Sequence, residues 1–174
     1  MTSGVKRRVD RNPPHLFCGR VRGEARRQRT CRMKWENTLV AYEEDLRTRT
    51  FWDWMKAHTS FFKPLHRYEG VLELNEERMI FHGRDVKKDE DFNLEIPIAD
   101  IRDLYLGWDE VFTGFPMSRA GDRAYPWNRP LRLRYKSDHD ERTLYCFARF
   151  HRRYGIRASD NREVLEKLRE SLDR

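Results

Sequence analysis

The segment from residue 131 to residue 136 constrains the fold of this chain most, because its side chains alternate strictly between apolar and basic. Leu131, Leu133 and Tyr135 take every second position, and basic residues fill the others. A period of two belongs to a β-strand that buries one face and exposes the other to water. The chain is therefore expected to build an antiparallel sheet with one buried face.

The same period continues through the middle of the chain. Residues 68–74 place apolar side chains on one face, and residues 78–83 follow after a turn at Asn75-Glu76. Two alternating runs separated by a short polar turn predict a β-hairpin. The charged segment 84–91 is expected to be a solvent-exposed loop. Three more strands are predicted over residues 92–98, 101–108 and 143–150.

Helical periodicity precedes this strand-rich region. Residues 34–60 are predicted to be helical in two pieces, because apolar residues recur at helical spacing from Leu39 to Leu46. Thr50 and Asp53 resemble a capping box that starts the second piece. This piece is dense in aromatic residues, which predicts a cover for one mouth of the sheet. A membrane-surface anchor and a contact with another subunit are the alternatives.

The C-terminal segment has the pattern of an amphipathic helix. Asp160 and Glu163 stand at the positions of an N-cap and its capping-box partner. Apolar residues then recur at helical spacing, at Val164, Leu165, Leu168 and Leu172. A single apolar stripe predicts that this helix packs on the sheet.

The order of these elements resembles the pleckstrin-homology (PH) superfold. Residues 70–74 (GVLEL) and 79–83 (MIFHG) are similar to the first hairpin of bacterial PH-like and GRAM-like domains, and residues 96–101 (IPIADI) resemble their step into the fourth strand. The resemblance covers residues 66–173. It implies a mainly-β α+β fold: an antiparallel bent sandwich or partly open barrel of six to seven strands. A C-terminal helix would cap it, and one or two N-terminal helices would precede it.

Three segments are therefore expected: a leader over residues 1–32, a helical extension over 33–63 and a PH-like domain over 64–174. The leader holds ten basic and two acidic side chains, and the whole chain has a formal net charge of +7. Such a polar, pattern-free segment is expected to be disordered. Three interpretations stay open for it: a phosphate-binding arm, an inert tail, or a stretch that precedes a true start at Met33.

The resemblance leaves the ligand open, because members of the PH superfold bind lipids, peptides or proteins. Phosphoinositide-binding members carry Lys and Arg at the first hairpin turn. The corresponding turn here, residues 74–78, contains Glu76 and Glu77. These carboxylates would repel an inositol phosphate, so a phosphoinositide ligand is not expected.

The connection between residues 108 and 130 is the main candidate for a binding surface. It is far longer than the usual hairpin loop of two to five residues, and it combines aromatic with basic side chains. One interpretation is a surface that binds a protein or peptide partner; the other is a small second core folded over the sheet. The candidate partner-binding residues are Trp108, Phe112, Phe115, Met117, Arg119, Arg123, Tyr125 and Trp127.

A weaker anion-binding candidate lies near the C-terminus, at Arg149, Arg152, Arg153 and Arg157. With the basic leader, it gives the alternative function of a binder of nucleic acid or another anionic surface.

No sequence motif indicates catalysis. The sequence lacks a glycine-rich phosphate loop, a nucleophile elbow and any His or Cys spacing typical of zinc, so neither a catalytic residue, a metal nor a cofactor is predicted. No apolar run approaches the roughly 18 residues of a membrane span. The three cysteines form no CxxC pair, which fits a reducing cytoplasm. The expected function is a non-enzymatic cytoplasmic module that binds a protein or peptide, in an oligomeric state that the pattern does not specify.

Overall fold

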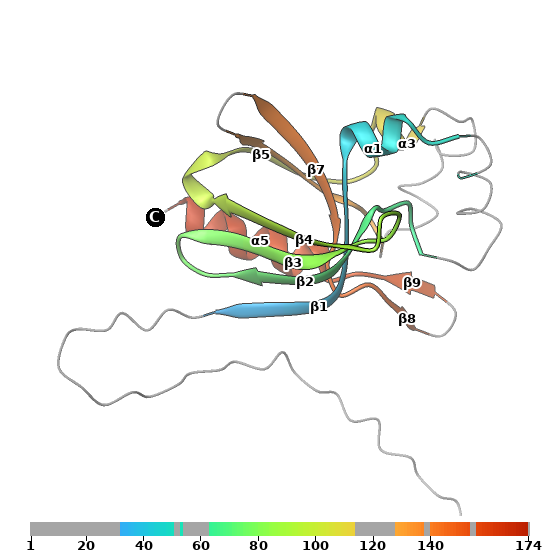
Figure 1. The fold of residues 1–174 in the computed structure, drawn as a ribbon. Coiled ribbons are helices and arrows are strands. Elements are labelled where there is room, and N and C mark those ends of the chain that lie inside the picture. Colours follow the sequence, from blue (N-terminus) through green and yellow to red (C-terminus); the bar gives the residue numbers. More distant parts are fainter. Residues whose placement is uncertain are drawn as a thin grey trace, which may run out of the picture.

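The computed structural model describes residues 32–50, 53, 63–113, 128–137, 140–153 and 156–173. Within these residues, seven antiparallel strands form one sheet in the order β4-β3-β2-β1-β7-β6-β5, with a C-terminal helix against it (Figure 1). The expected mainly-β α+β fold is confirmed. The strands of the sheet are β1 (Met33–Tyr42), β2 (Tyr68–Leu74), β3 (Arg78–Asp85), β4 (Glu90–Pro97), β5 (Ile101–Leu106), β6 (Leu131–Lys136) and β7 (Glu141–Phe147).

Several shorter elements accompany the sheet. Two three-residue strands, β8 (His151–Arg153) and β9 (Ile156–Ala158), pair with each other in a separate ribbon. The helical elements are α1 (Glu43–Arg47), the 3-10 turn η1 (Ile98–Asp100), α3 (Glu110–Thr113) and α5 (Asn161–Leu172).

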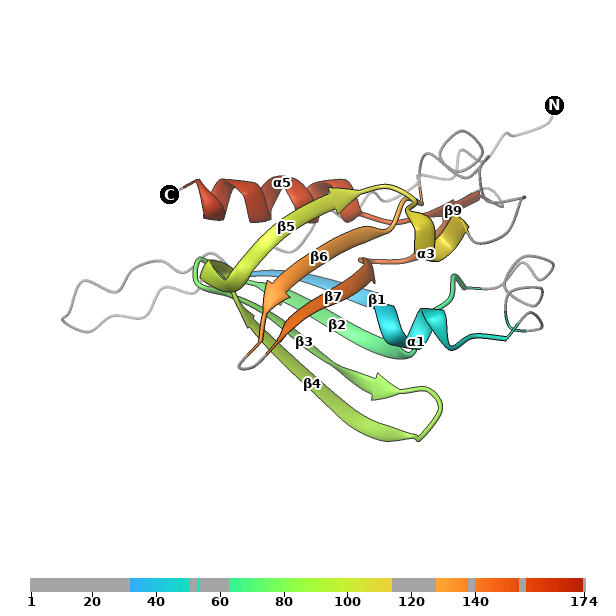
Figure 2. The same cartoon turned by 90° about the horizontal axis from the view of Figure 1, so that it is seen from above.

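The sheet consists of two meanders that share strand β1. Strands β1 to β4 follow one another, and so do β5 to β7, while β1 pairs with both β2 and β7. The second meander crosses the first steeply, so that the sheet bends around its inner face (Figures 1 and 2). The register along β1 shifts between Trp35 and Thr38, and Asn37 between them has a φ of 50°. This bulge lies where β1 passes from one meander to the other.

The prediction of a helix over residues 34–42 is wrong, because these residues form the central strand β1. Leu39, Val40 and Ala41 are consecutive and all buried, which is typical of a strand covered on both faces. Helix begins only at Glu43, in the five-residue α1. Residues 33–42 are therefore part of the sheet and not of a helical extension that precedes a domain starting at residue 64.

The capping box predicted at Thr50 is confirmed. The backbone N–H of Thr50 donates to Asp53 Oδ2 at 3.1 Å, and the N–H of Asp53 donates to Thr50 Oγ1 at 3.3 Å. The rest of the aromatic piece predicted over residues 51–60 lies outside the described residues. The same holds for residues 1–31, whereas Arg32 forms an ion pair with Glu73 of β2.

The predicted hairpin of residues 68–83 is confirmed as β2 and β3, with Leu74 opposite Met79. The side chain of Asn75 closes the turn by accepting from the N–H groups of Glu77 and Arg78, at 2.9 and 2.8 Å. Since β1 precedes it, this hairpin is the second of the sheet. Its acidic turn therefore does not correspond to the first hairpin turn, where phosphoinositide-binding PH domains carry Lys and Arg. The first connection, between β1 and β2, contains α1.

The expected loop over residues 84–91 is shorter than predicted. Strand β3 continues to Asp85 and β4 begins at Glu90, so that Val86–Asp89 alone form the turn. Asp85 is buried in spite of its charge, because Arg67 and the turn amides bind its carboxylate. The density of charged residues predicts a loop, but the ion pair between Arg67 and Asp85 stabilises the end of strand β3 instead.

Helix α5 closes the inner face, as predicted, by contacting β5, β6 and η1. Val164, Leu165 and Leu168 are buried in the main core, whereas Leu172 is exposed. The predicted capping box is not formed: the Asp160 side chain makes no capping bond and pairs instead with Arg149 at 3.1 Å. The buried side chain of Asn161 fixes this end, because it accepts from the N–H of Ala148 and donates to the carbonyls of Cys146 and Arg129.

Candidate functional site

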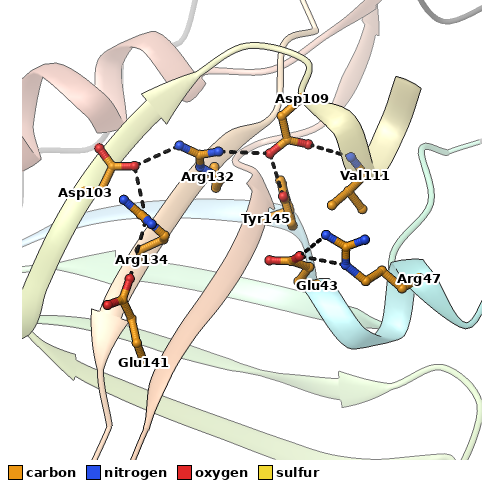
Figure 3. Close-up of polar contacts among 9 residues, drawn as sticks. All are labelled: Glu43, Arg47, Asp103, Asp109, Val111, Arg132, Arg134, Glu141 and Tyr145. Atoms are coloured by element: carbon orange, nitrogen blue, oxygen red, sulfur yellow. Dashed lines mark hydrogen bonds and ion pairs between the residues drawn. The ribbon is translucent and has the colours of Figure 1, made fainter. Parts of the chain in front are cut away.

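A pocket lies on the outer face of the sheet, at the root of the connection between β5 and β6. Its volume is about 340 Å³, and helices α1 and α3 form its walls together with strands β5, β6 and β7 (Figure 3). It is lined by Glu43, Arg47, Tyr105, Trp108, Asp109, Glu110, Val111, Arg132 and Tyr145.

The floor of the pocket is a second hydrophobic cluster. Strand β7 is buried on both faces: Leu144 and Cys146 face the main core, while Tyr145 packs outside it with Ala41, Leu46 and Phe112. The ring of Phe112 meets those of Tyr145 and Trp108 edge-on, with centroid distances of 5.1 and 5.2 Å. This aromatic contact holds α3 against the sheet.

Asp109 is the centre of the polar network. Its carboxylate accepts from the Tyr145 hydroxyl at 2.6 Å, from Arg132 Nη1 at 3.2 Å and from the backbone N–H of Val111 at 3.2 Å (Figure 3). The last bond caps the start of α3. One carboxylate therefore joins β7, β6 and the first turn of the β5–β6 connection.

Arg132 is held between two carboxylates and a ring. Its Nη2 donates to Asp103 at 2.8 Å, and its guanidinium lies 5.0 Å from the centre of the Tyr105 ring. Burial opposes the charge of Arg132, but the bonds to Asp103 and Asp109 outweigh it and raise the pKa of this guanidinium. Burial and the bond to Asp109 also raise the pKa of Tyr145, so its hydroxyl remains a donor.

The rim consists of charged side chains that are mostly paired. Arg47 of α1 donates through Nε to Glu43 at 2.7 Å, and its Nη2 lies 2.5 Å from the same oxygen. Arg134 lies 3.4 Å from Asp103 and 3.6 Å from Glu141. Glu110, at the start of α3, is exposed and forms no ion pair with any residue that the structure describes.

Two of the eight predicted partner-binding residues lie here. Trp108 lines the pocket, whereas Phe112 is buried beneath it, so the expectation of a small second core holds for Phe112. The other six lie outside the described residues: Phe115, Met117, Arg119, Arg123, Tyr125 and Trp127.

Most residues of the pocket were not predicted from the sequence as site residues. Arg132 and Tyr145 were expected to belong to ordinary strands, and Glu43 and Arg47 to a long helix. A signal was present in the alternating segment 131–136, because every outward position there is basic. Repeated cations on one strand face call for carboxylates opposite them, and Asp103 and Asp109 fill that role.

The predicted anion-binding residues fall into two groups in the structure. Arg149 is neutralised by Asp160. Arg152, Arg153 and Arg157 belong to the β8–β9 ribbon, in which Arg152 is the register partner of Arg157. The side chains of these three arginines lie outside the described part of the chain.

Within the described residues, no three His, Cys, Asp or Glu side chains are grouped so as to hold a metal ion, and no helix is long and apolar enough to cross a membrane. Cys146 is a free, buried thiol, and burial raises its pKa to about 12. No protein-family model and no curated protein matches the sequence of this chain.

Proposed function

We propose that this chain is a non-enzymatic, cytoplasmic interaction module with a PH-like fold, and that it binds a protein or peptide partner at the root of the β5–β6 connection. The strand order supports the PH-like assignment, since two meanders joined through β1 and β7 are covered by a C-terminal helix. The free, buried thiol of Cys146 is compatible with a reducing compartment.

The observation that carries the proposal is the pocket of about 340 Å³, which lies within the range of ligand-binding clefts, roughly 300–1,000 Å³. Part of its polar wall is held in place before any partner arrives, because Asp109 fixes Tyr145 and Arg132. Preorganised side chains lose little entropy on binding, which favours recognition. Tyr105 and Trp108 supply the aromatic area typical of binding hot spots.

Variants at the pocket test this proposal. Glu110→Lys and Tyr105→Ser should each reduce retention of a stoichiometric partner from host lysate by about tenfold, the effect expected of a hot-spot residue. The retained proteins are quantified by mass spectrometry with the full chain immobilised. Glu166→Lys on α5, an exposed position with the same change of charge, is the matched control and should retain the partner. Equal retention by all three variants would contradict the proposal.

A second candidate function, binding to nucleic acid or another anionic surface, is favoured by the β8–β9 ribbon. The register places Arg152 opposite Arg157. Basic residues at facing register positions are disfavoured in a strand pair unless a counter-charge is present, and an external anion would supply it. A two-stranded ribbon also has dimensions that fit the major groove of DNA.

Heparin chromatography tests this second candidate. If the ribbon binds polyanions, retention should persist after residues 1–31 are deleted. The double variant Arg152→Ser/Arg157→Ser should then elute at lower salt, because each lost phosphate contact reduces the salt dependence by about 0.7–0.9 in log–log slope. The variant Arg134→Ser/Lys136→Ser on β6 removes the same charge elsewhere and should elute unchanged. Loss of retention on deletion of residues 1–31 alone would assign the binding to the leader.

A further inference from the structure

We infer that the pocket accepts a cationic side chain of the partner, an arginine or a lysine. This inference rests on the proposed function, because it names the chemistry that the same site would recognise. Three features of the described residues support it. They are the net negative charge of the pocket lining, the aromatic side chains in its walls, and the guanidinium of Arg132, which the protein already binds between carboxylates and an aromatic ring.

The balance of charge in the pocket is negative. Three carboxylates and two guanidinium groups line it. Both guanidinium groups form ion pairs: Arg47 with Glu43, and Arg132 with Asp103 and Asp109. Asp103 adds a fourth carboxylate just behind the lining, and Arg134, 3.4 Å from it, adds a third guanidinium group, so one carboxylate remains in excess. The exposed Glu110 is a carboxylate that no described cation neutralises.

This arrangement favours a cation over an anion. At Arg132 an anionic ligand would compete with the two carboxylates that hold this guanidinium, which leaves only the exposed donors of Arg47 that Glu43 does not occupy. A cationic ligand displaces none of these pairs. It is attracted by the carboxylate of Glu110 and by the net negative charge of the pocket. Specificity arises here as much from the penalty on the wrong charge as from attraction of the right one.

The aromatic walls add to this preference. Tyr105 is 38% exposed, which makes it one of few large apolar side chains on the described surface, and Trp108 also lines the pocket. Arginine and lysine are attracted to the faces of such rings.

The guanidinium of Arg132 shows that the site can hold a cation in this way. It lies between Asp103 and Asp109, as Figure 3 shows. It also lies 5.0 Å from the centre of the Tyr105 ring. A second cation at the mouth, between Glu110 and the aromatic side chains, would repeat this chemistry. A volume of about 340 Å³ is large enough to admit one such side chain.

Nuclear magnetic resonance of the ¹⁵N-labelled full chain tests the inference with four defined probes. These are the N-acetyl, N-methylamide derivatives of arginine, lysine, norleucine and glutamate, added up to about 50 mM because single side chains bind in the millimolar range. The arginine and lysine probes should shift the backbone amides of Tyr105, Val111 and the indole of Trp108 in a saturable way. The norleucine and glutamate probes should not.

Glu110→Gln should weaken the arginine probe by about twofold to fivefold, as expected for an exposed ion pair, while Glu166→Gln on α5 should leave it unchanged. Tighter binding of the glutamate probe, or no saturable shift with any probe, would overturn the inference. If a partner depends on the pocket but the cationic probes do not bind, the proposed function stands and the inference of a cation site fails. Binding of the cationic probes with no pocket-dependent partner would retain the cation site and remove the proposed function.

Discussion

Trp35→Ala is expected to lower the free energy of unfolding by about 3–5 kcal/mol, the usual cost of removing a large aromatic side chain from a core. Trp35 lies on the central strand β1 and is only 1% exposed. Its indole Nε1–H donates to Glu163 of α5 at 3.3 Å, so that one side chain joins the first strand to the last helix. The variant would leave a cavity where these two elements meet.

Chemical denaturation of the full chain measures this effect, with Leu172→Ala as the control. Leu172 also lies on the apolar stripe of α5, but it is 41% exposed, and its truncation should cost less than about 1 kcal/mol. A cost for Trp35→Ala as small as that of Leu172→Ala would mean that residues 33–42 are dispensable for the fold. That result would contradict the position of β1 between β2 and β7.

The expected effect at Trp35 also shows where sequence analysis was insufficient. The strands with one solvated face, such as β6, were predicted because alternation leaves a clear period of two. Strand β1 has neighbours on both faces, so Leu39, Val40 and Ala41 are all buried and the alternation is lost. A short helix, α1, follows it directly, and together they imitate a helical spacing from Leu39 to Leu46. Only the long-range pairing of β1 with β2 and β7 distinguishes this strand from a helix.

The candidate site has the same limitation for a different reason. Trp108 was predicted as a binding residue because it belongs to an unusually long connection that combines aromatic with basic side chains. Glu43, Arg132 and Tyr145 come from three separate elements, and no local spacing relates them. They meet because β6 and β7 are adjacent and β1 places α1 above them. Such a site depends on topology, so its residues are invisible to patterns within a single segment.

Arg67→Met is expected to lower the free energy of unfolding by about 3 kcal/mol at neutral pH, near the lower end of the range for breaking a buried ion pair. Arg67 precedes β2 and binds Asp45 of α1 at 2.5 Å through Nη1 and Asp85 of β3 at 2.9 Å through Nε. Their carboxylate side chains are only 11% and 7% exposed. The variant would leave both charges without this partner.

Arg78→Met is the matched control for this substitution. Arg78 also forms an ion pair, with Glu95, but both side chains are about half exposed. Water solvates the remaining carboxylate there, so the cost should stay below about 1 kcal/mol. Equal costs for the two variants would mean that burial does not determine the strength of the Arg67 network.

The pH dependence provides a separate test of the Arg67 network. Burial alone would raise the pKa of Asp85, but the N–H groups of Lys87 and Lys88 and the guanidinium of Arg67 hold it below its ordinary value. The unfolded chain takes up this proton near pH 3.9, so the stabilisation is complete above about pH 4 and is lost as the pH falls below it. Once Asp85 is protonated it needs no cation. The difference between the wild type and Arg67→Met should therefore shrink below about pH 4, in denaturation curves recorded from pH 7 to pH 3. A difference that stays constant over this range would exclude Asp85 as the group that makes Arg67 important.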